Sequence, residues 1–105
     1  MAVCTVFKNP NPRTNAAVPY LLDVQSELFS ELGTRLVVPL YRAEAAGVQA
    51  ISRLTPVMRF QGASLVAMVP ELAGIPRREL GVPCGDLPDA RNEVLRAIDL
   101  LLAGF

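Results

Sequence analysis

The sequence predicts a mainly β domain that carries one α-helix at its C-terminal end. Short runs of alternating apolar and polar residues, each bounded by turn-forming residues, recur through most of the chain and are typical of β-strands. The last part of the chain instead repeats its apolar residues at helical spacing. With 105 residues, 51% of them hydrophobic and 19% charged, the chain fits a single folded domain over residues 1–105 and excludes a disordered one.

Three strands are predicted in the first half of the chain. The first covers residues 2–8, and the turn-rich run 9–15 separates it from a second strand at 18–25. After another loop, the third strand covers residues 35–42. Because Pro39 has no backbone N–H to donate, we expect this third strand to lie at a sheet edge or to contain a bulge.

The second half begins with a segment at 43–48 that is too short and too interrupted by glycine to predict a helix. A β-hairpin is predicted next, with strands at 55–60 and 63–69. Its turn lies at Gln61-Gly62, because glycine and its polar neighbour suit the tight turn between two strands.

One further short strand is predicted over residues 73–80, before the terminal helix. Arg77 and Arg78 lie in this segment and are followed by Glu79, so we expect them on a solvated face rather than at an anion site. The predicted strands therefore occupy about residues 2–80.

The clearest predicted element is a helix at about residues 87–103. Asp86 is expected to cap its N-terminus, since an aspartate there can accept hydrogen bonds from the first backbone N–H groups. The apolar residues that recur at helical spacing are expected to pack on the sheet: Leu87, Val94, Ile98, Leu101 and Phe105. Leu100 and Ala103 project to the opposite side, and this excess apolar surface predicts a partner or a dimer contact.

The composition argues against several classes of function. The chain has ten basic and ten acidic side chains, so it lacks the basic surplus that drives direct DNA binding. It has no histidine, which removes the commonest general base and the usual zinc ligands, and no glycine-rich phosphate loop. The sequence therefore predicts no catalytic residues, no metal and no cofactor. Cys4 and Cys84 are expected to be buried free thiols.

Neither a membrane span nor a signal peptide is expected. No charge-free apolar run approaches the ~20 residues that a spanning helix needs. The N-terminus has no charged region before an apolar stretch. We therefore expect a cytoplasmic protein.

Several runs, taken together and in order, resemble one family. The runs are YLLDVQS at residues 20–26, TRLVVPL at 34–40, LTPV at 54–57, Ile75-Pro76, and the ending from Arg91-Asn92-Glu93 to Gly104-Phe105. They cover almost the whole chain and resemble the CcdB family of bacterial toxins. The DVQS segment, the strand ending in Pro-Leu and the terminal helix are specific only in combination.

The resemblance implies a small SH3-like antiparallel barrel or sheet with one long C-terminal helix, assembled as a homodimer. It also implies a toxin of a toxin–antitoxin system that is not an enzyme. Such a toxin binds the DNA gyrase A subunit and traps gyrase on cleaved DNA. A cognate antitoxin with a flexible C-terminal segment neutralises the toxin. The complex of the two represses its own operon, so operator DNA is contacted only through that complex.

The resemblance places the gyrase-binding residues in two parts of the chain. Leu28 and Phe29 match an apolar pair in the loop that follows DVQS. The others lie at the helix tip: Asp99, Leu102, Ala103, Gly104 and Phe105. Two of these depart from the best-known members, which have Trp in place of Ala103 and Asn in place of Asp99.

The sequence also allows other roles for some of these residues and other functions for the chain. Leu28 and Phe29 could plug onto the core, and Gly104 could serve only as a helix C-cap. A second function, on the same fold, is that of a MazF-like ribonuclease that cleaves messenger RNA. It would require basic and hydroxyl groups in one groove, with Arg35, Arg59 and Ser64 as candidates. A third is an interaction module whose toxicity has decayed.

Overall fold

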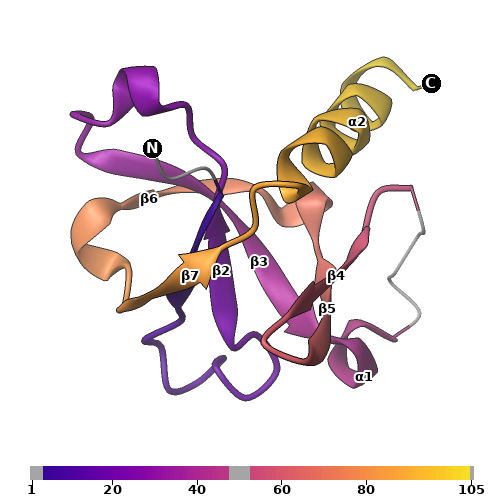
Figure 1. Cartoon of the computed structure of the whole chain (residues 1–105), viewed down its shortest axis with the longest axis horizontal. Helices are drawn as coiled ribbons and strands as arrows, with labels where there is room; N and C mark the ends of the chain where they lie inside the picture. Colours follow the sequence, from indigo (N-terminus) through magenta and orange to yellow (C-terminus); the bar gives the residue numbers. More distant parts are fainter. Residues whose placement is uncertain (1–3, 48–52, 105) are drawn as a thin grey trace.

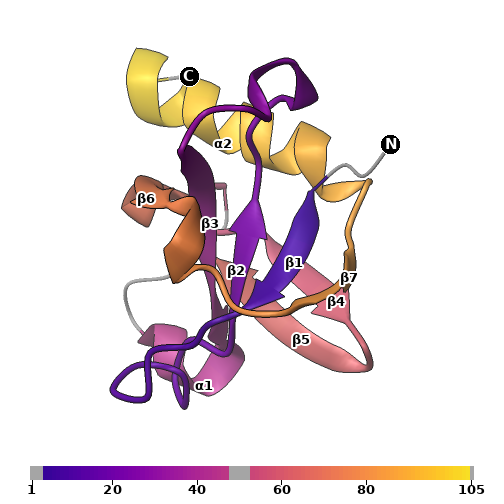
Figure 2. The ribbon, with the colours of Figure 1, turned by 90° about the vertical axis from the view of Figure 1, so that its left-hand side faces the viewer.

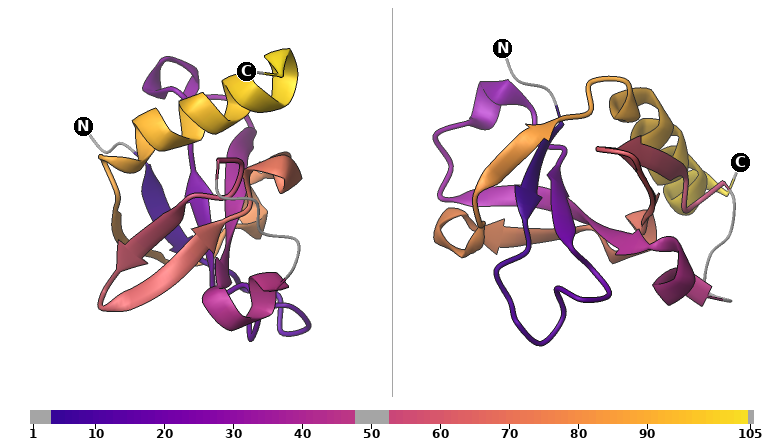
Figure 3. Two further views of the ribbon diagram at one scale, coloured as in Figure 1. Left: turned by 90° about the vertical axis from the view of Figure 1, so that its right-hand side faces the viewer. Right: turned by 60° about the horizontal axis from the view of Figure 1, so that its bottom comes forward.

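The computed structural model describes residues 4–47 and 53–104 of the chain. Within those ranges, seven strands form one curled antiparallel sheet, and the long helix α2 lies across one end of it (Figures 1 and 3). The strands are β1 (Thr5–Lys8), β2 (Tyr20–Asp23), β3 (Thr34–Arg42), β4 (Val57–Phe60), β5 (Ala63–Ala67), β6 (Ala73–Pro76) and β7 (Pro83–Asp86). In the described ranges the helices are α1 (Ala43–Ala46) and α2 (Ala90–Ala103), and short 3-10 turns include η1 (Glu27–Phe29), η3 (Val69–Glu71) and η4 (Arg77–Glu79). The predicted mainly β fold with a C-terminal helix is confirmed.

Strand β3 organises the sheet, because its nine residues pair with three other strands. One edge of β3 lies against β2. The other edge lies against β6 near the start of β3 and against β5 near its end. The order across the sheet is β4-β5-β3-β2-β1-β7, with β6 beside β3, and Figure 2 shows how these strands curl around the interior.

The prediction placed the strand of Pro39 at a sheet edge or at a bulge, and the interior position of β3 shows that the edge alternative is wrong. The Pro39 carbonyl accepts a hydrogen bond from the Met68 backbone N–H at 3.0 Å, on the side of β3 that faces β5 and β6. The ring nitrogen of Pro39 faces the same side, since the N and O of one strand residue point the same way. The pairing with β6 ends at Val37 and the pairing with β5 starts at Leu40, so neither strand needs an N–H from Pro39.

The predicted hairpin is confirmed, with Gln61 and Gly62 both at positive φ (50° and 83°), as a type I′ turn requires. The strand predicted over 73–80 ends at Pro76, and η4 replaces its second half. Strand β7 was not predicted and extends the strands beyond residue 80. It contains proline and glycine, which are rare in strands, and pairing with β1 holds it in place.

Helix α2 begins at Ala90, three residues after the predicted start, with Asp89 rather than Asp86 at its N-cap. Asp86 lies in β7 opposite Thr5, which explains why it cannot cap the helix. At the other end Gly104 adopts φ 80° and donates its N–H to the Leu100 carbonyl at 2.8 Å, so Gly104 is the C-cap of the helix.

The core lies between the curled sheet and α2. Its most fully buried side chains come from the sheet, from the start of η3 and from the middle of the helix: Val6, Leu22, Val38, Leu40, Leu65, Val69 and Val94. The helix packs through Ala90, Val94 and Ala97, with Leu87 and Ile98 partly buried beside them. The small alanines allow a close approach of the helix backbone to the sheet.

Part of the predicted apolar stripe on α2 is wrong. Leu101 is exposed and Leu100 is half-buried, because the buried face runs through Ala90 and Ala97 instead. Phe105 lies outside the described residues. Both cysteines are free, with Cys4 buried and Cys84 half-buried. In the described part of the chain, no helix has the length and apolar character needed to cross a membrane.

Candidate functional site

The η1 loop, residues 26–33 between β2 and β3, presents apolar side chains to solvent. Leu28 is 88% exposed and Phe29 is 56% exposed, and Leu32 is exposed as well. Neither member of the predicted pair therefore plugs onto the core, and that alternative is wrong. Three apolar side chains within five residues of a short loop are typical of a surface that binds another protein.

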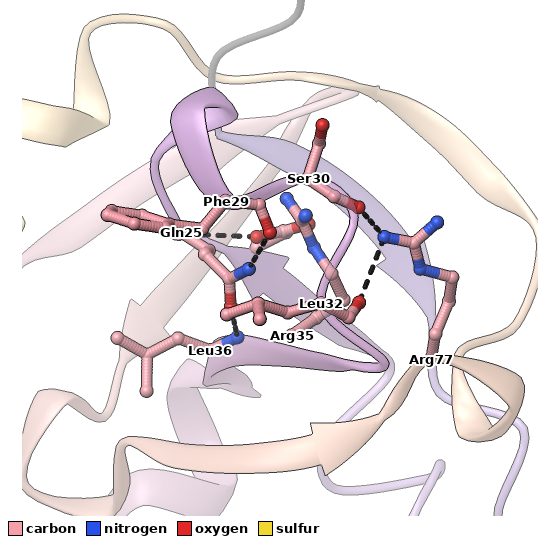
Figure 4. A network of polar contacts seen from close by, with 8 residues as sticks. Gln25, Phe29, Ser30, Leu32, Arg35, Leu36 and Arg77 are labelled. Carbon is pink, nitrogen blue, oxygen red and sulfur yellow. Dashed lines mark hydrogen bonds and ion pairs between the residues drawn. The ribbon is translucent and has the colours of Figure 1, made fainter.

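Side-chain hydrogen bonds hold this loop in its shape (Figure 4). The amide of Gln25 donates from Nε2 to the Phe29 carbonyl at 2.8 Å, and its Oε1 accepts from the Leu36 backbone N–H at 3.0 Å. At the start of the loop, the Ser26 hydroxyl accepts from the Leu28 N–H at 3.2 Å. One glutamine thus ties the end of η1 to the first part of β3.

A buried ion pair lies beneath the loop. Arg35 on β3 donates from Nε to Oδ2 of Asp23 on β2 at 2.8 Å, and both side chains are buried. The other carboxylate oxygen of Asp23 accepts from the Gln25 backbone N–H at 3.0 Å. The ion pair therefore fixes Asp23, which holds the backbone of Gln25, and Gln25 in turn holds the loop.

Arg77 is exposed, as predicted, and it also holds the other end of the loop. Its Nη2 donates to the carbonyl oxygens of Ser30 and Leu32. Its backbone N–H donates to the Gly33 carbonyl at 2.9 Å. Arg78 is exposed and makes no such contact with the described residues.

The tip of α2 is the second predicted region. Leu102 is 81% exposed, and Asp99, one turn earlier on the same side, is exposed too. Ala103 and Gly104 are also exposed. The tip is therefore an apolar surface with one carboxylate, and the predicted contribution of Phe105 lies outside the described residues.

The structure brings the two regions to the same end of the molecule. In Figure 1 the η1 loop stands at the upper left and α2 at the upper right. Figure 2, turned by 90°, again places both at the top. A partner that covered this end of the molecule could contact both regions at once.

The groove that a ribonuclease would need is not formed by the candidate residues. Arg59 donates from Nη1 to the Ser64 hydroxyl at 3.3 Å across the β4–β5 hairpin. Arg35 lies near the start of β3, whereas β5 pairs with the end of β3, so Arg35 is about 20 Å from that hairpin along the strand. Arg35 is also engaged by Asp23.

The titratable groups with shifted pKa values are not suited to general-base chemistry. The hydrogen bond that Tyr41 donates to Glu71, at 2.6 Å, raises the pKa of the Tyr41 hydroxyl to about 12. Burial raises the pKa of the Cys4 thiol. Among the described residues, no three metal-binding side chains lie close enough together to hold a metal ion.

Sequence reasoning from the residues alone missed Gln25, Arg35 and Arg77 as residues that hold the loop. One signal was available, because Asp23 and Arg35 are charged residues within otherwise apolar strands. Among known protein families, the family model described as CcdB protein matches residues 4–104, which is nearly the whole chain.

Proposed function

The chain belongs to the CcdB family and is a toxin of a toxin–antitoxin system, and on that premise we propose that it poisons DNA gyrase. It binds the gyrase A subunit and traps the complex of gyrase with cleaved DNA, so that replication stalls on a double-strand break. The protein acts as an inhibitor in the cytoplasm and not as an enzyme. The observation that carries this proposal is the exposure of Leu28, Phe29 and Leu102 at one end of the molecule.

The proposed gyrase-binding surface combines the η1 loop with the helix tip. It contains Leu28, Phe29, Asp99, Leu102, Ala103, Gly104 and Phe105. A few well-packed residues near the centre of a protein interface supply most of its binding energy. The polar contacts around Gln25 and Arg77 support the proposal, because a loop held in one shape loses less conformational entropy on binding.

The proposed assembly is a homodimer. A two-fold toxin can present the same surface twice to a two-fold target. In the same proposal a cognate antitoxin covers the toxin and neutralises it, and the complex of the two represses the operon. Exposed apolar residues on α2, such as Leu95 and Leu101, support the presence of at least one further contact on the helix.

A gyrase assay with purified protein tests the function. We expect cleaved plasmid DNA to accumulate when gyrase is incubated with the protein, and a messenger transcript to remain intact. Leu28→Ser should reduce the cleaved fraction at least tenfold. Val82→Ser is the matched control, because Val82 is also an exposed aliphatic side chain but lies outside the two regions, and it should behave like wild type. Cleavage of RNA with no effect on gyrase would contradict the proposal.

Ala103 provides a second test, since the best-known members of the family have Trp there. If the helix tip contacts gyrase, Ala103→Trp should change the affinity for the A subunit by more than tenfold, which corresponds to about 1.4 kcal/mol. The affinity is measured by calorimetry. An unchanged affinity would mean that this position does not contact gyrase.

A further inference from the structure

A pocket of about 340 Å³ opens beside the η1 loop. It lies between the sheet and the segment that follows β6, and two arginines contribute to its lining, Arg35 from β3 and Arg77 from η4. Figure 4 shows the Arg35 guanidinium under the loop, between the ring of Phe29 and the side chain of Arg77. The volume of the pocket is at the lower end of the range for small-molecule binding sites, about 300–1,000 Å³.

Arg35 is buried but still has hydrogen-bond donors to offer. Its side chain is only 9% exposed, and its Nε is occupied by Asp23. Its two Nη groups make no hydrogen bond to the described residues. In the described ranges, every side-chain nitrogen or oxygen of a residue that is not exposed either has a hydrogen-bond partner or reaches solvent. Because the two Nη groups of Arg35 have no partner, they reach solvent, and they do so in the pocket that Arg35 lines.

Arg77 adds a second positive charge at the pocket. It uses Nη2 for the two loop carbonyls and leaves its other side-chain nitrogens available. Two guanidinium groups and the single carboxylate of Asp23 leave the pocket with a net positive charge. The site is therefore suited to an anion.

We infer that this pocket receives a carboxylate group, supplied by an aspartate or glutamate side chain of a partner polypeptide. A planar carboxylate matches the two parallel Nη donors of one guanidinium. Two guanidinium groups and one carboxylate leave the pocket with one net positive charge, which a single carboxylate neutralises.

The surroundings favour a protein side chain over a free small acid. Phe7 and Leu80 supply apolar lining that fits the methylene groups of a glutamate. Ser30, which also lines the pocket, directly follows the exposed pair Leu28 and Phe29. A partner segment lying on the loop would thus bring its side chains to the pocket. The inference does not require that the partner be gyrase, and it stands if no gyrase poisoning is found.

The test uses nuclear magnetic resonance of the full chain, with the side-chain Nε–H signals of its arginines as reporters. We expect N-acetyl-glutamate N-methylamide to shift the Arg35 and Arg77 signals until they saturate, and to leave Arg78 unchanged. The matching glutamine derivative, which is neutral, should produce no shift. Acetate and inorganic phosphate should each bind at least fivefold more weakly than the glutamate derivative.

Three results would overturn the inference. The first is the absence of a saturable shift at Arg35. The second is tighter binding of phosphate, which would indicate a phosphate site, and the third is equal or tighter binding of acetate, which would indicate a site for free small acids.

A pair of variants separates the pocket from general charge effects. Arg77→Gln should weaken the glutamate derivative at least fivefold, whereas Arg78→Gln, with the same loss of charge one residue away, should change its affinity less than twofold. Arg77 also holds the loop, so a further variant is needed to separate its charge from this structural role. Arg77→Lys restores the charge and should recover at least half of the lost affinity on a logarithmic scale. Equal affinities of wild type and Arg77→Gln would contradict the role of Arg77.

Discussion

The η1 loop and the tip of α2 both expose apolar side chains, but the structure holds them in place by different means. The loop has no regular structure beyond η1, and polar contacts from Gln25, Arg35 and Arg77 support it from below. The tip continues a helix whose middle is buried, so its backbone needs no outside contact beyond the cap at Gly104. The loop should therefore be sensitive to changes at buried polar residues, and the tip should tolerate changes that leave the helix anchor intact.

The largest effect on stability is expected when the ion pair beneath the loop is broken. Arg35→Met leaves the carboxylate of Asp23 buried without its partner, which should lower the free energy of unfolding by about 3–5 kcal/mol. Urea denaturation measures the change. Arg78→Met is the control and should stay within about 0.5 kcal/mol of wild type. A loss below 1 kcal/mol for Arg35→Met would show that the pair does not support the loop region.

Truncation of the tip should separate function from stability. Removal of Ala103, Gly104 and Phe105 should abolish toxicity to growing cells while it lowers the free energy of unfolding by only ~1–2 kcal/mol, because Ala90, Val94 and Ala97 still anchor the helix. Thermal unfolding and a growth assay measure the two effects. A truncated protein that no longer folds would show that the tip belongs to the core.

A smaller loss is expected when the glutamine that ties the loop to β3 is removed. Gln25→Ala deletes the hydrogen bonds to Phe29 and Leu36 and should cost about 1 kcal/mol. Hydrogen exchange should become faster at the Leu36 N–H, and toxicity should fall. Gln61→Ala removes the single bond to Cys84 in a distant turn and serves as the control, with toxicity unchanged.

The smallest effect is expected outside both regions, at the hydrogen bond between Tyr41 and Glu71. The pKa of Tyr41 is raised from 10.0 to about 12, so the folded protein keeps the phenol proton where the unfolded chain loses it. The contribution to stability is complete below pH 10 and declines as the pH rises through 12. Tyr41→Phe should remove this decline from a stability profile measured against pH and should leave toxicity unchanged. An identical profile in both proteins would contradict the assignment.

The elements that the sequence predicted well depend on local chemistry. The Gln61-Gly62 turn needs only two residues that tolerate positive φ, and α2 follows from its own apolar spacing. Strand β7 was missed because its pairing with β1 brings together residues about 80 positions apart. The interior location of Pro39 depends on where two other strands end, which no property of its own segment reveals.

Within the candidate site, too, the sequence predicted the features that depend on local residues and missed those that depend on distant contacts. Leu28 and Phe29 were singled out by family resemblance, and their exposure is a local consequence of the short loop. The role of Arg77 arises from contacts with a segment 45–47 residues earlier in the chain, so neither spacing nor composition could predict it. The helix tip was placed correctly as exposed surface, although the predicted stripe assigned Leu101 to the wrong face.

We propose that the loop and the tip act together as one gyrase-binding surface. The decisive measurement is calorimetric titration of the gyrase A subunit with wild type, Leu28→Ser, Leu102→Ser and the control Val82→Ser. We expect each of the two site variants to bind at least tenfold more weakly, a loss of about 1.4 kcal/mol, and the control to match wild type. Wild-type affinity for either Leu28→Ser or Leu102→Ser would contradict the claim.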